Sequence, residues 1–282
     1  MGKSVNGVLH DIVDLAVDGL PPGAQAAQRT VVDLGTAHTV VLLRGYAAVR
    51  VRRDLGTAAG MRRRQQLVDS IPASVGFLLP RSLGPVVELD GTSAVATELI
   101  PGAPCPAGEG DLGELRKLLA RVASIPTGPI EELLAEPLEF CGGAEWYGIQ
   151  RKEVVPLLDG DVQGRALHAV CALAALEPFR EVFAHGDLAG QNVFWDGGRV
   201  VGVLDWDLAS RSDRSTDLAC VGAWNGWDKL PLIADSEDTS RALVRRNTFR
   251  LQQLAFAVVN GRSAEEIQRT AARASAWLRQ NL

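Results

Sequence analysis

The first hundred residues alternate between short strand-like runs and two segments with helical spacing. Apolar side chains recur every three or four positions over Val8–Val17, which predicts an amphipathic helix, and a second helix is expected at about Ala58–Ser70. Between and after them come runs rich in β-branched and aromatic residues, broken by glycine turns. The predicted strands are Thr30–Leu34, Thr39–Leu43, Tyr46–Arg52, Gly76–Leu79, Val86–Leu89 and Ala94–Leu99. This half should form an antiparallel sheet with helices packed against it.

The pattern changes at Thr97-Glu98-Leu99-Ile100-Pro101-Gly102, where a proline and a glycine follow an apolar strand. Such a sequence suits a hinge between lobes, so we expect one lobe over residues 1–97 and a second over residues 98–282. Beyond the hinge, apolar positions recur mainly at helical spacing. The predicted helices are Leu112–Ser124 (capped by Asp111), Ile130–Ala135, Ala144–Leu158, Val162–Leu176, Thr216–Ala223, Asp238–Val259 and Ala264–Leu282. The fold class is therefore α+β.

One stretch of the second lobe departs from this helical pattern. The apolar runs Asn192–Trp195 and Val200–Leu204 flank Asp196-Gly197-Gly198-Arg199, the pattern of a β-hairpin with a glycine turn. Polar side chains stand at its open end, namely Asp187, Asn192, Asp205 and Asp207. Because a hairpin brings its open ends together, three carboxylates and one amide should converge, and such hard oxygen ligands suit Mg²⁺. A hydrated acidic turn would explain the charges but not their ordered spacing.

Composition and charge narrow the function. The net charge is −5, which argues against general nucleic-acid binding. Residues 1–97 hold 10 Lys and Arg against 8 Asp and Glu, whereas residues 98–282 hold 19 against 26. The acidic second lobe favours a cationic substrate, although acidic helices kept in solution would give the same balance. No apolar run is long enough to span a membrane, and the N-terminus lacks a secretory core, so a cytoplasmic protein is expected. The four cysteines show no paired spacing.

The ordered spacing around the hairpin resembles a known family. His185-Gly186-Asp187-Leu188, then Asn192, then Asp205-Trp206-Asp207, is similar to the catalytic and metal loops of the aminoglycoside phosphotransferase and choline kinase family. The resemblance implies a two-lobed protein-kinase-like fold and Mg²⁺-dependent transfer of the γ-phosphate of ATP or GTP. Asp187 would orient the acceptor hydroxyl and accept its proton, Asn192 and Asp205 would hold the metal, and His185 would brace the loop. Asp217 would tie the loop down from behind.

The residues expected to contact the nucleotide depart from those that the family usually has. Arg50 stands where the family usually has a strand-borne lysine, and the following helix offers Gln65 and Gln66 in place of the expected glutamate. The turn Gly35-Thr36-Ala37-His38 would cover the phosphates, with an ordinary hairpin turn as the alternative. The purine would be received near the hinge by Thr97, Leu99 and Ile100, largely through backbone groups.

The acceptor implied by the resemblance is an antibiotic. The segment Arg246–Gln253 is similar to the viomycin and capreomycin phosphotransferases, which modify cationic peptide antibiotics, and an aminoglycoside or a macrolide would also fit. Asp228 and Glu145 are the predicted substrate contacts. Glu145 ends an acidic run that begins at Glu131 and includes Glu132, Glu136 and Glu139, for which a solvated face is the alternative. There are two competing functions. The protein could phosphorylate a small metabolite such as choline, or it could be a nucleotide-binding pseudokinase that regulates a partner.

Overall fold

The computed structural model describes residues 5–32, 38–53 and 57–282. The chain divides into two compact units. The first covers Met1–Ala103 with two short pieces of the later hairpin, Phe194–Asp196 and Val201–Leu204. The second covers Pro104–Val193, Gly197–Val200 and Asp205–Leu282. The change from one unit to the other along the chain thus falls just after the Pro101-Gly102 pair.

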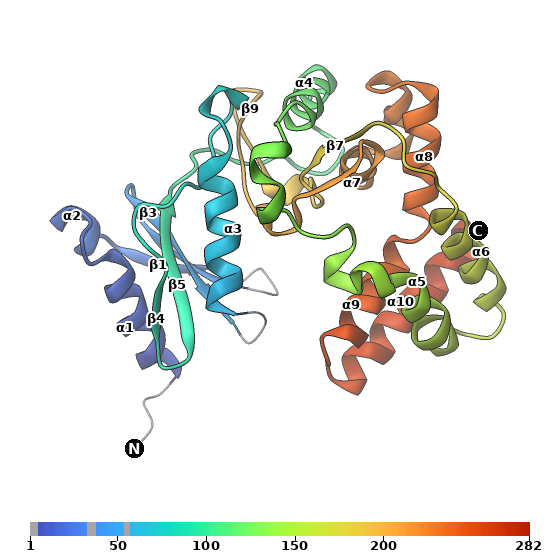
Figure 1. The fold of residues 1–282 in the computed structure, drawn as a ribbon, viewed down its shortest axis with the longest axis horizontal. Helices are drawn as coiled ribbons and strands as arrows, with labels where there is room; N and C mark the ends of the chain where they lie inside the picture. The colour runs from blue at the N-terminus through green and yellow to red at the C-terminus, as the bar shows by residue number, and fades with distance from the viewer. Residues whose placement is uncertain (1–4, 33–37, 54–56) are drawn as a thin grey trace. The chain divides into compact units, whose positions relative to one another are not determined.

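The first unit is built on a five-stranded antiparallel sheet of order β1-β2-β3-β5-β4 (Figure 1). The strands are β1 (Arg29–Val32), β2 (His38–Leu43), β3 (Ala47–Arg52), β4 (Val87–Leu89) and β5 (Thr92–Glu98). The helices are α1 (Val5–Val17), α2 (Pro22–Gln25) and α3 (Ala58–Ser70), with a 3₁₀ turn at Ala73–Val75. α3 begins at its Thr57 cap, whose hydroxyl accepts a hydrogen bond from the Gly60 amide.

Alternation along the strands explains the core of this unit. Every second side chain of β2, β3 and β5 points to one face of the sheet, where it packs against the apolar side of α1. The cluster includes Ile12, Val13, Val41, Leu43, Val49, Val51, Ala94 and Ala96. The opposite face of β3 carries Arg50, which is paired in register with Val40 of β2 and Val95 of β5.

The predicted strand over residues 76–79 does not form. Leu78 makes a single parallel bridge to Gly202, because its backbone bonds to Val201 and Val203.

The second unit is mainly helical, as the sequence predicts. Its helices are α4 (Leu112–Ala123), α5 (Trp146–Ile149), α6 (Gln163–Ala174), α7 (Ser215–Asn225), α8 (Ser236–Arg246), α9 (Phe249–Val259) and α10 (Ala264–Asn281). Shorter 3₁₀ turns occur at Gly128–Leu133, Glu139–Cys141, Gly143–Glu145, Val155–Leu157, Gly190–Asn192, Trp206–Leu208 and Trp227–Leu232, and a π-helical turn at Gln150–Val154. The predicted helix over residues 238–259 is two helices, interrupted at Asn247 and Thr248.

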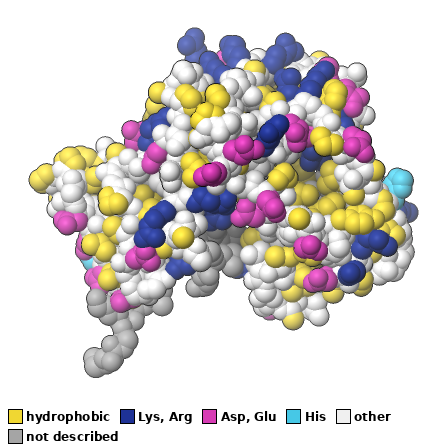
Figure 2. Space-filling model, viewed as in Figure 1, with side chains coloured by type: hydrophobic (Ala, Val, Ile, Leu, Met, Phe, Trp, Pro, Cys, Tyr) yellow, Lys and Arg dark blue, Asp and Glu magenta, His cyan; other side chains and the backbone are white. Residues whose placement is uncertain are grey.

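Five short strands and a cluster of helices position the functional residues. β7 (Glu181–Ala184) pairs with β10 (Ser210–Asp213), and β8 (Val193–Asp196) and β9 (Arg199–Val203) form the predicted hairpin, with β6 (Ala103–Pro104) beside β8. An apolar cluster joins α5, the turns after it, α6, α9 and α10. Figure 2 shows hydrophobic side chains exposed in a hollow of this unit, with acidic side chains beside it. No helix in the described part of the chain combines the length and apolar character needed to cross a membrane.

Candidate active site

One buried carboxylate fixes the backbone of the loop between β7 and β8. Asp217, on the first turns of α7, accepts hydrogen bonds from the backbone amides of His185 at 2.8 Å and Gly186 at 2.9 Å. Burial raises the pKa of Asp217, and His185 and the two amides oppose that shift. Gly186 has φ of +84°, and a side chain there would clash with the carbonyl oxygen of Leu208. The backbone path of the loop is therefore fixed on both sides.

His185 packs under this loop and faces no solvent. Its ring lies edge-on to Trp206 with centroids 4.5 Å apart, and both side chains are buried. The amide of Asp187 donates to Nδ1 of His185 at 3.2 Å, which requires that this nitrogen carries no proton. These contacts place His185 against the loop, and its role in bracing the loop, which the resemblance implies, stays a prediction.

Asp187 and Asn192 meet across the loop. The side-chain amide of Asn192 donates to the Asp187 carbonyl at 2.8 Å and to its carboxylate Oδ2 at 3.0 Å. These two bonds fix the orientation of the amide and leave Oδ1 of Asn192 available as a ligand oxygen. Burial, with a contribution from the nearby charge of Asp205, raises the pKa of Asp187 to about 7, and the Asn192 hydrogen bond acts in the opposite direction.

Asp205 follows the second hairpin strand in an unusual backbone conformation. Its φ of 60° and ψ of 65° place a non-glycine residue in the left-handed region, which is costly unless the surroundings hold it there. Trp206, the next residue, stabilises this conformation. Its side chain is 1% exposed and packs against Phe183 and His185. The Asp205 charge acts on the Asp187 carboxyl group, which Asn192 contacts directly, so the structure brings these three residues into one cluster.

This cluster fits a magnesium ion that is also bound by phosphate. Among the described residues, no group of three or more His, Cys, Asp or Glu side chains is arranged to hold a metal alone. Mg²⁺ is commonly held by one or two protein oxygens together with nucleotide phosphates and water. The free Oδ1 of Asn192 and the Asp205 carboxylate are donors of that kind, and the mutual repulsion of Asp187 and Asp205 is what a cation would relieve.

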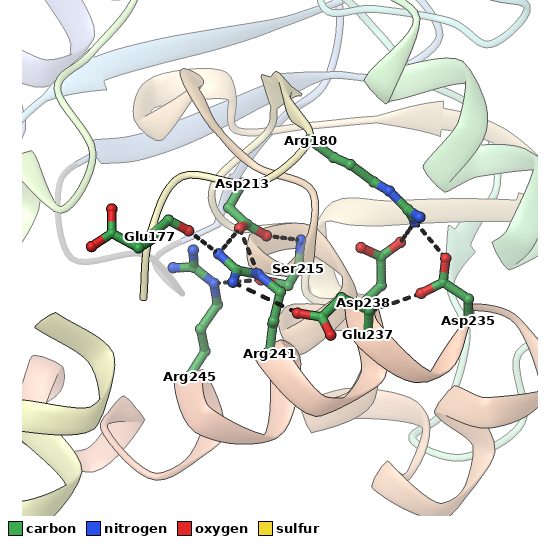
Figure 3. Close-up of polar contacts among 9 residues, drawn as sticks. All are labelled: Glu177, Arg180, Asp213, Ser215, Asp235, Glu237, Asp238, Arg241 and Arg245. Atoms are coloured by element: carbon green, nitrogen blue, oxygen red, sulfur yellow. Dashed lines mark hydrogen bonds and ion pairs between the residues drawn. The ribbon is translucent and has the colours of Figure 1, made fainter. Parts of the chain in front are cut away.

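Behind the loop, a second charged network joins β10, α7 and α8 (Figure 3). Arg241 of α8 donates to the buried Asp213 carboxylate through Nε at 2.8 Å and through a terminal nitrogen, and to the Glu177 carbonyl at 2.6 Å. Asp213 also accepts from the Ser215 amide, and Arg245 donates from Nε to the Ser215 hydroxyl at 2.8 Å. The network fixes the start of α7, two residues before Asp217.

The predicted nucleotide residues all lie in the first unit. A terminal guanidinium nitrogen of Arg50 lies 3.2 Å from Nδ1 of His38 on the neighbouring strand. The Gln65 amide donates to the Asp69 carboxylate and the Pro80 carbonyl. Thr97 is buried and donates to the Ala48 carbonyl, and Leu99 and Ile100 follow the end of β5. Residues 35–37 of the predicted phosphate-covering turn lie outside the described residues.

The two predicted substrate carboxylates lie apart from the cavity of the second unit. Asp228 and Glu145 are both exposed, and neither lines that cavity, although Trp146 does. Its acidic lining residues are Glu136 and Glu139, which belong to the run singled out in the sequence. Arg245 also lines the cavity, and it was not predicted from the sequence. A single arginine on an amphipathic helix has no spacing that distinguishes it from a surface residue, so no sequence signal was available.

The fold and the loop geometry together define a two-lobed, kinase-like phosphotransferase. The model of the phosphotransferase enzyme family matches residues 86–254. The viomycin phosphotransferase of Streptomyces vinaceus is 31% identical over 211 residues, covering 68% of this chain and 74% of that protein. The chain belongs to the phosphotransferase enzyme family, as the sequence predicts.

Solved structures of low sequence identity share the fold. The GDP and kanamycin complex of an aminoglycoside phosphotransferase superimposes with a TM-score of 0.77 at 13% identity, covering 97% of this chain and 98% of that chain. The apoenzyme of a macrolide 2'-phosphotransferase from Brachybacterium faecium gives a TM-score of 0.65 at 16% identity, covering 94% and 97%. The predicted α+β fold of the kinase-like class is thus confirmed.

Proposed function

We propose that the protein transfers the γ-phosphoryl group of ATP or GTP to a hydroxyl group of an antibiotic, in a reaction that requires Mg²⁺. The acceptor would be a cationic peptide antibiotic or an aminoglycoside. Support for the peptide class is the sequence relative, a viomycin phosphotransferase at 31% identity. Support for the aminoglycoside class is similarity of fold, at 13% identity for the kanamycin complex. We therefore rank the peptide class first.

The observation that carries the proposal is the double hydrogen bond from Asn192 to Asp187, on a loop whose amides bind Asp217. It holds the Asp187 carboxylate in one orientation, which a group that aims an acceptor hydroxyl requires. The raised pKa of Asp187, about 7, also suits a residue that takes a proton near neutral pH. Burial of the carboxylate and repulsion from Asp205 are the physical causes of that shift.

The other residues of the proposal divide between metal and nucleotide. Asn192 and Asp205 would hold Mg²⁺, which when bound neutralises charge on the phosphate oxygens. Arg50 would add a second cation toward the phosphates, since a guanidinium suits phosphate oxygens. Thr97, Leu99 and Ile100 would receive the purine at the end of β5. Solved relatives of this fold hold GDP or ADP, so both ATP and GTP are retained as donors.

The test is a direct assay for phosphate transfer. The protein is incubated with Mg²⁺ and ATP or GTP, and separately with viomycin, kanamycin, hygromycin B, a macrolide and choline, and products are examined by mass spectrometry. We expect one added phosphoryl group on viomycin, on kanamycin or on both. A product with choline alone would replace the antibiotic function by a metabolite kinase. Nucleotide binding without any product would favour a regulatory pseudokinase and overturn the proposal.

A further inference from the structure

A cavity of about 220 Å³ lies within the second unit, beside the catalytic loop. It borders that loop at Gly186, the residue immediately before Asp187. One wall is apolar and partly aromatic, and is formed by Leu138, Phe140, Trp146, Leu173, Leu176, Leu208 and Phe249. The cavity therefore offers an apolar surface close to the residue that we propose aims the acceptor hydroxyl.

The polar residues of the cavity are segregated by charge. Glu136 and Glu139 are exposed, so their carboxylates stand at the mouth. The lining residues Ser212 and Gln252 are buried, and Arg245 is half-buried. A ligand that enters would meet the exposed carboxylates first and then the less exposed guanidinium.

Arg245 has hydrogen-bonding capacity that the protein leaves unused. Its Nε donates to the Ser215 hydroxyl, and among the described residues its two terminal nitrogens form no hydrogen bond with protein atoms. Figure 3 shows these nitrogens on the side away from Ser215. The nearest carboxylates are already occupied, because Asp213 accepts from Arg241 and Asp217 accepts from the two loop amides. Unpaired donors beside an apolar wall favour a ligand that brings an oxygen acceptor.

We propose that this cavity is an acceptor-recognition site in which Arg245 binds a carbonyl or carboxylate oxygen of a peptide-type acceptor while Glu136 and Glu139 attract its ammonium groups. This inference rests on the proposed function and names the class of acceptor. A peptide carries both amide carbonyls and ammonium groups. An aminoglycoside such as kanamycin carries several ammonium groups and no carbonyl, and the guanidinium repels cations. Arg245 would therefore select a peptide antibiotic over an aminoglycoside.

The experiment measures binding and turnover separately, with viomycin as the peptide probe and kanamycin as the competitor. Calorimetry without nucleotide gives the viomycin Kd, and steady-state assays give KM and kcat for both acceptors. Wild type should prefer viomycin. In Arg245→Gln, the Kd and KM for viomycin should rise roughly ten- to hundredfold, as expected when a charge-assisted hydrogen bond is lost, with kcat changed less. The preference over kanamycin should shrink accordingly.

A second pair of variants tests the cavity without touching Arg245. Ala174 lines the cavity and is exposed, so Ala174→Trp should obstruct the mouth and weaken viomycin binding at least tenfold. Ala175 is the adjacent exposed residue and does not line it, so Ala175→Trp should bind as wild type does. Arg250→Gln, an exposed arginine on α9 that also lies outside the lining, is the charge-matched control for Arg245→Gln. Thermal unfolding identifies any variant that fails to fold.

The outcomes separate this inference from the proposed function. Viomycin phosphorylation that is unaffected by Arg245→Gln and Ala174→Trp would overturn the inference and leave the function standing. Viomycin binding that both variants weaken, without phosphorylation of any acceptor, would support the recognition site and overturn the function. A wild-type preference for kanamycin would overturn the inference.

Discussion

The two units hold their proposed functional residues in different ways. In the second unit, side chains fix the catalytic loop through bonds that only particular residue types can form: Asp217 accepts two backbone amides and Asn192 donates twice to Asp187. In the first unit, the proposed purine contacts rely on backbone groups, and the Thr97 hydroxyl is turned into the sheet toward Ala48. Residue identity is therefore constrained in one unit and much freer in the other.

The largest expected effect lies in the constrained unit, at Asp187. Asp187→Asn keeps the size of the side chain and removes its ability to take a proton, so we expect kcat to fall by about 10³-fold. Nucleotide affinity should stay within about threefold of wild type, because the proposed nucleotide contacts lie on other residues. Steady-state kinetics and calorimetry with nucleotide provide the two measurements.

Asp196→Asn is the matched control for that change. Asp196 is an exposed carboxylate at the far end of the same hairpin, so the same chemical substitution should leave kcat unaltered. Equal turnover in the Asp187 variant and in wild type would show that proton acceptance has been assigned to the wrong residue.

The next largest effect tests the support behind the loop. Arg241 and Asp213 are both buried, and Arg241→Met would remove the ion-pair partner of the Asp213 carboxylate, which would keep its hydrogen bond from the Ser215 amide. Breaking such a pair from one side costs about 3–5 kcal/mol, which we expect as a decrease in the free energy of unfolding. Urea denaturation measures it. Arg269→Met, which breaks an exposed ion pair with Glu265 on α10, should cost less than about 1 kcal/mol.

The same pair predicts the pH dependence of stability. Burial raises the pKa of Asp213, but the hydrogen bonds from Arg241 and Ser215 outweigh it, so the net pKa is below the ordinary value. A carboxyl group with a lower pKa in the folded state stabilises the protein above its unfolded pKa, about 3.9, and loses that contribution as the pH falls through the folded pKa. The stability difference between wild type and Arg241→Met should therefore narrow below about pH 4. A difference that stays constant from pH 7 to pH 3 would contradict this account.

A smaller effect is expected in the less constrained unit, at Arg50. If Arg50 contacts the phosphates, Arg50→Met should raise the nucleotide KM by roughly tenfold, as for a lost hydrogen bond between charged groups. Arg50→Lys should recover part of the loss, because lysine supplies the charge without the guanidinium fork. Arg52→Met is the control, since Arg52 lies two residues along the same strand and donates to the Gly91 carbonyl. Equal nucleotide KM values for wild type and Arg50→Met would place the phosphate-binding cation elsewhere.

Some features of the molecule could be predicted from the sequence and others could not. The hairpin and the clustering of Asp187, Asn192 and Asp205 could be predicted, because two apolar runs around a glycine turn leave few other structures. The break between α8 and α9 could not, because the apolar spacing continues through it, while the buried Thr248 donates its hydroxyl back to the Arg245 carbonyl in the last turn of α8. Arg245 was missed for a related reason, since its role depends on which cavity it borders and not on its neighbours in the chain.

The smallest effects concern Asp228 and Glu145, which stay predicted acceptor contacts. Both are exposed, and an exposed ion pair contributes about 0.2–1 kcal/mol, so Asp228→Asn or Glu145→Gln should raise the acceptor KM by at most about fivefold. The effect should shrink as salt is added, because screening weakens exposed charge pairs more than buried ones. Glu153→Gln removes a comparable exposed carboxylate on the turn after α5 and serves as the control. If all three variants match wild type at low salt, recognition of the acceptor's ammonium groups must come from other acidic residues, with Glu136 and Glu139 at the cavity mouth the first to test.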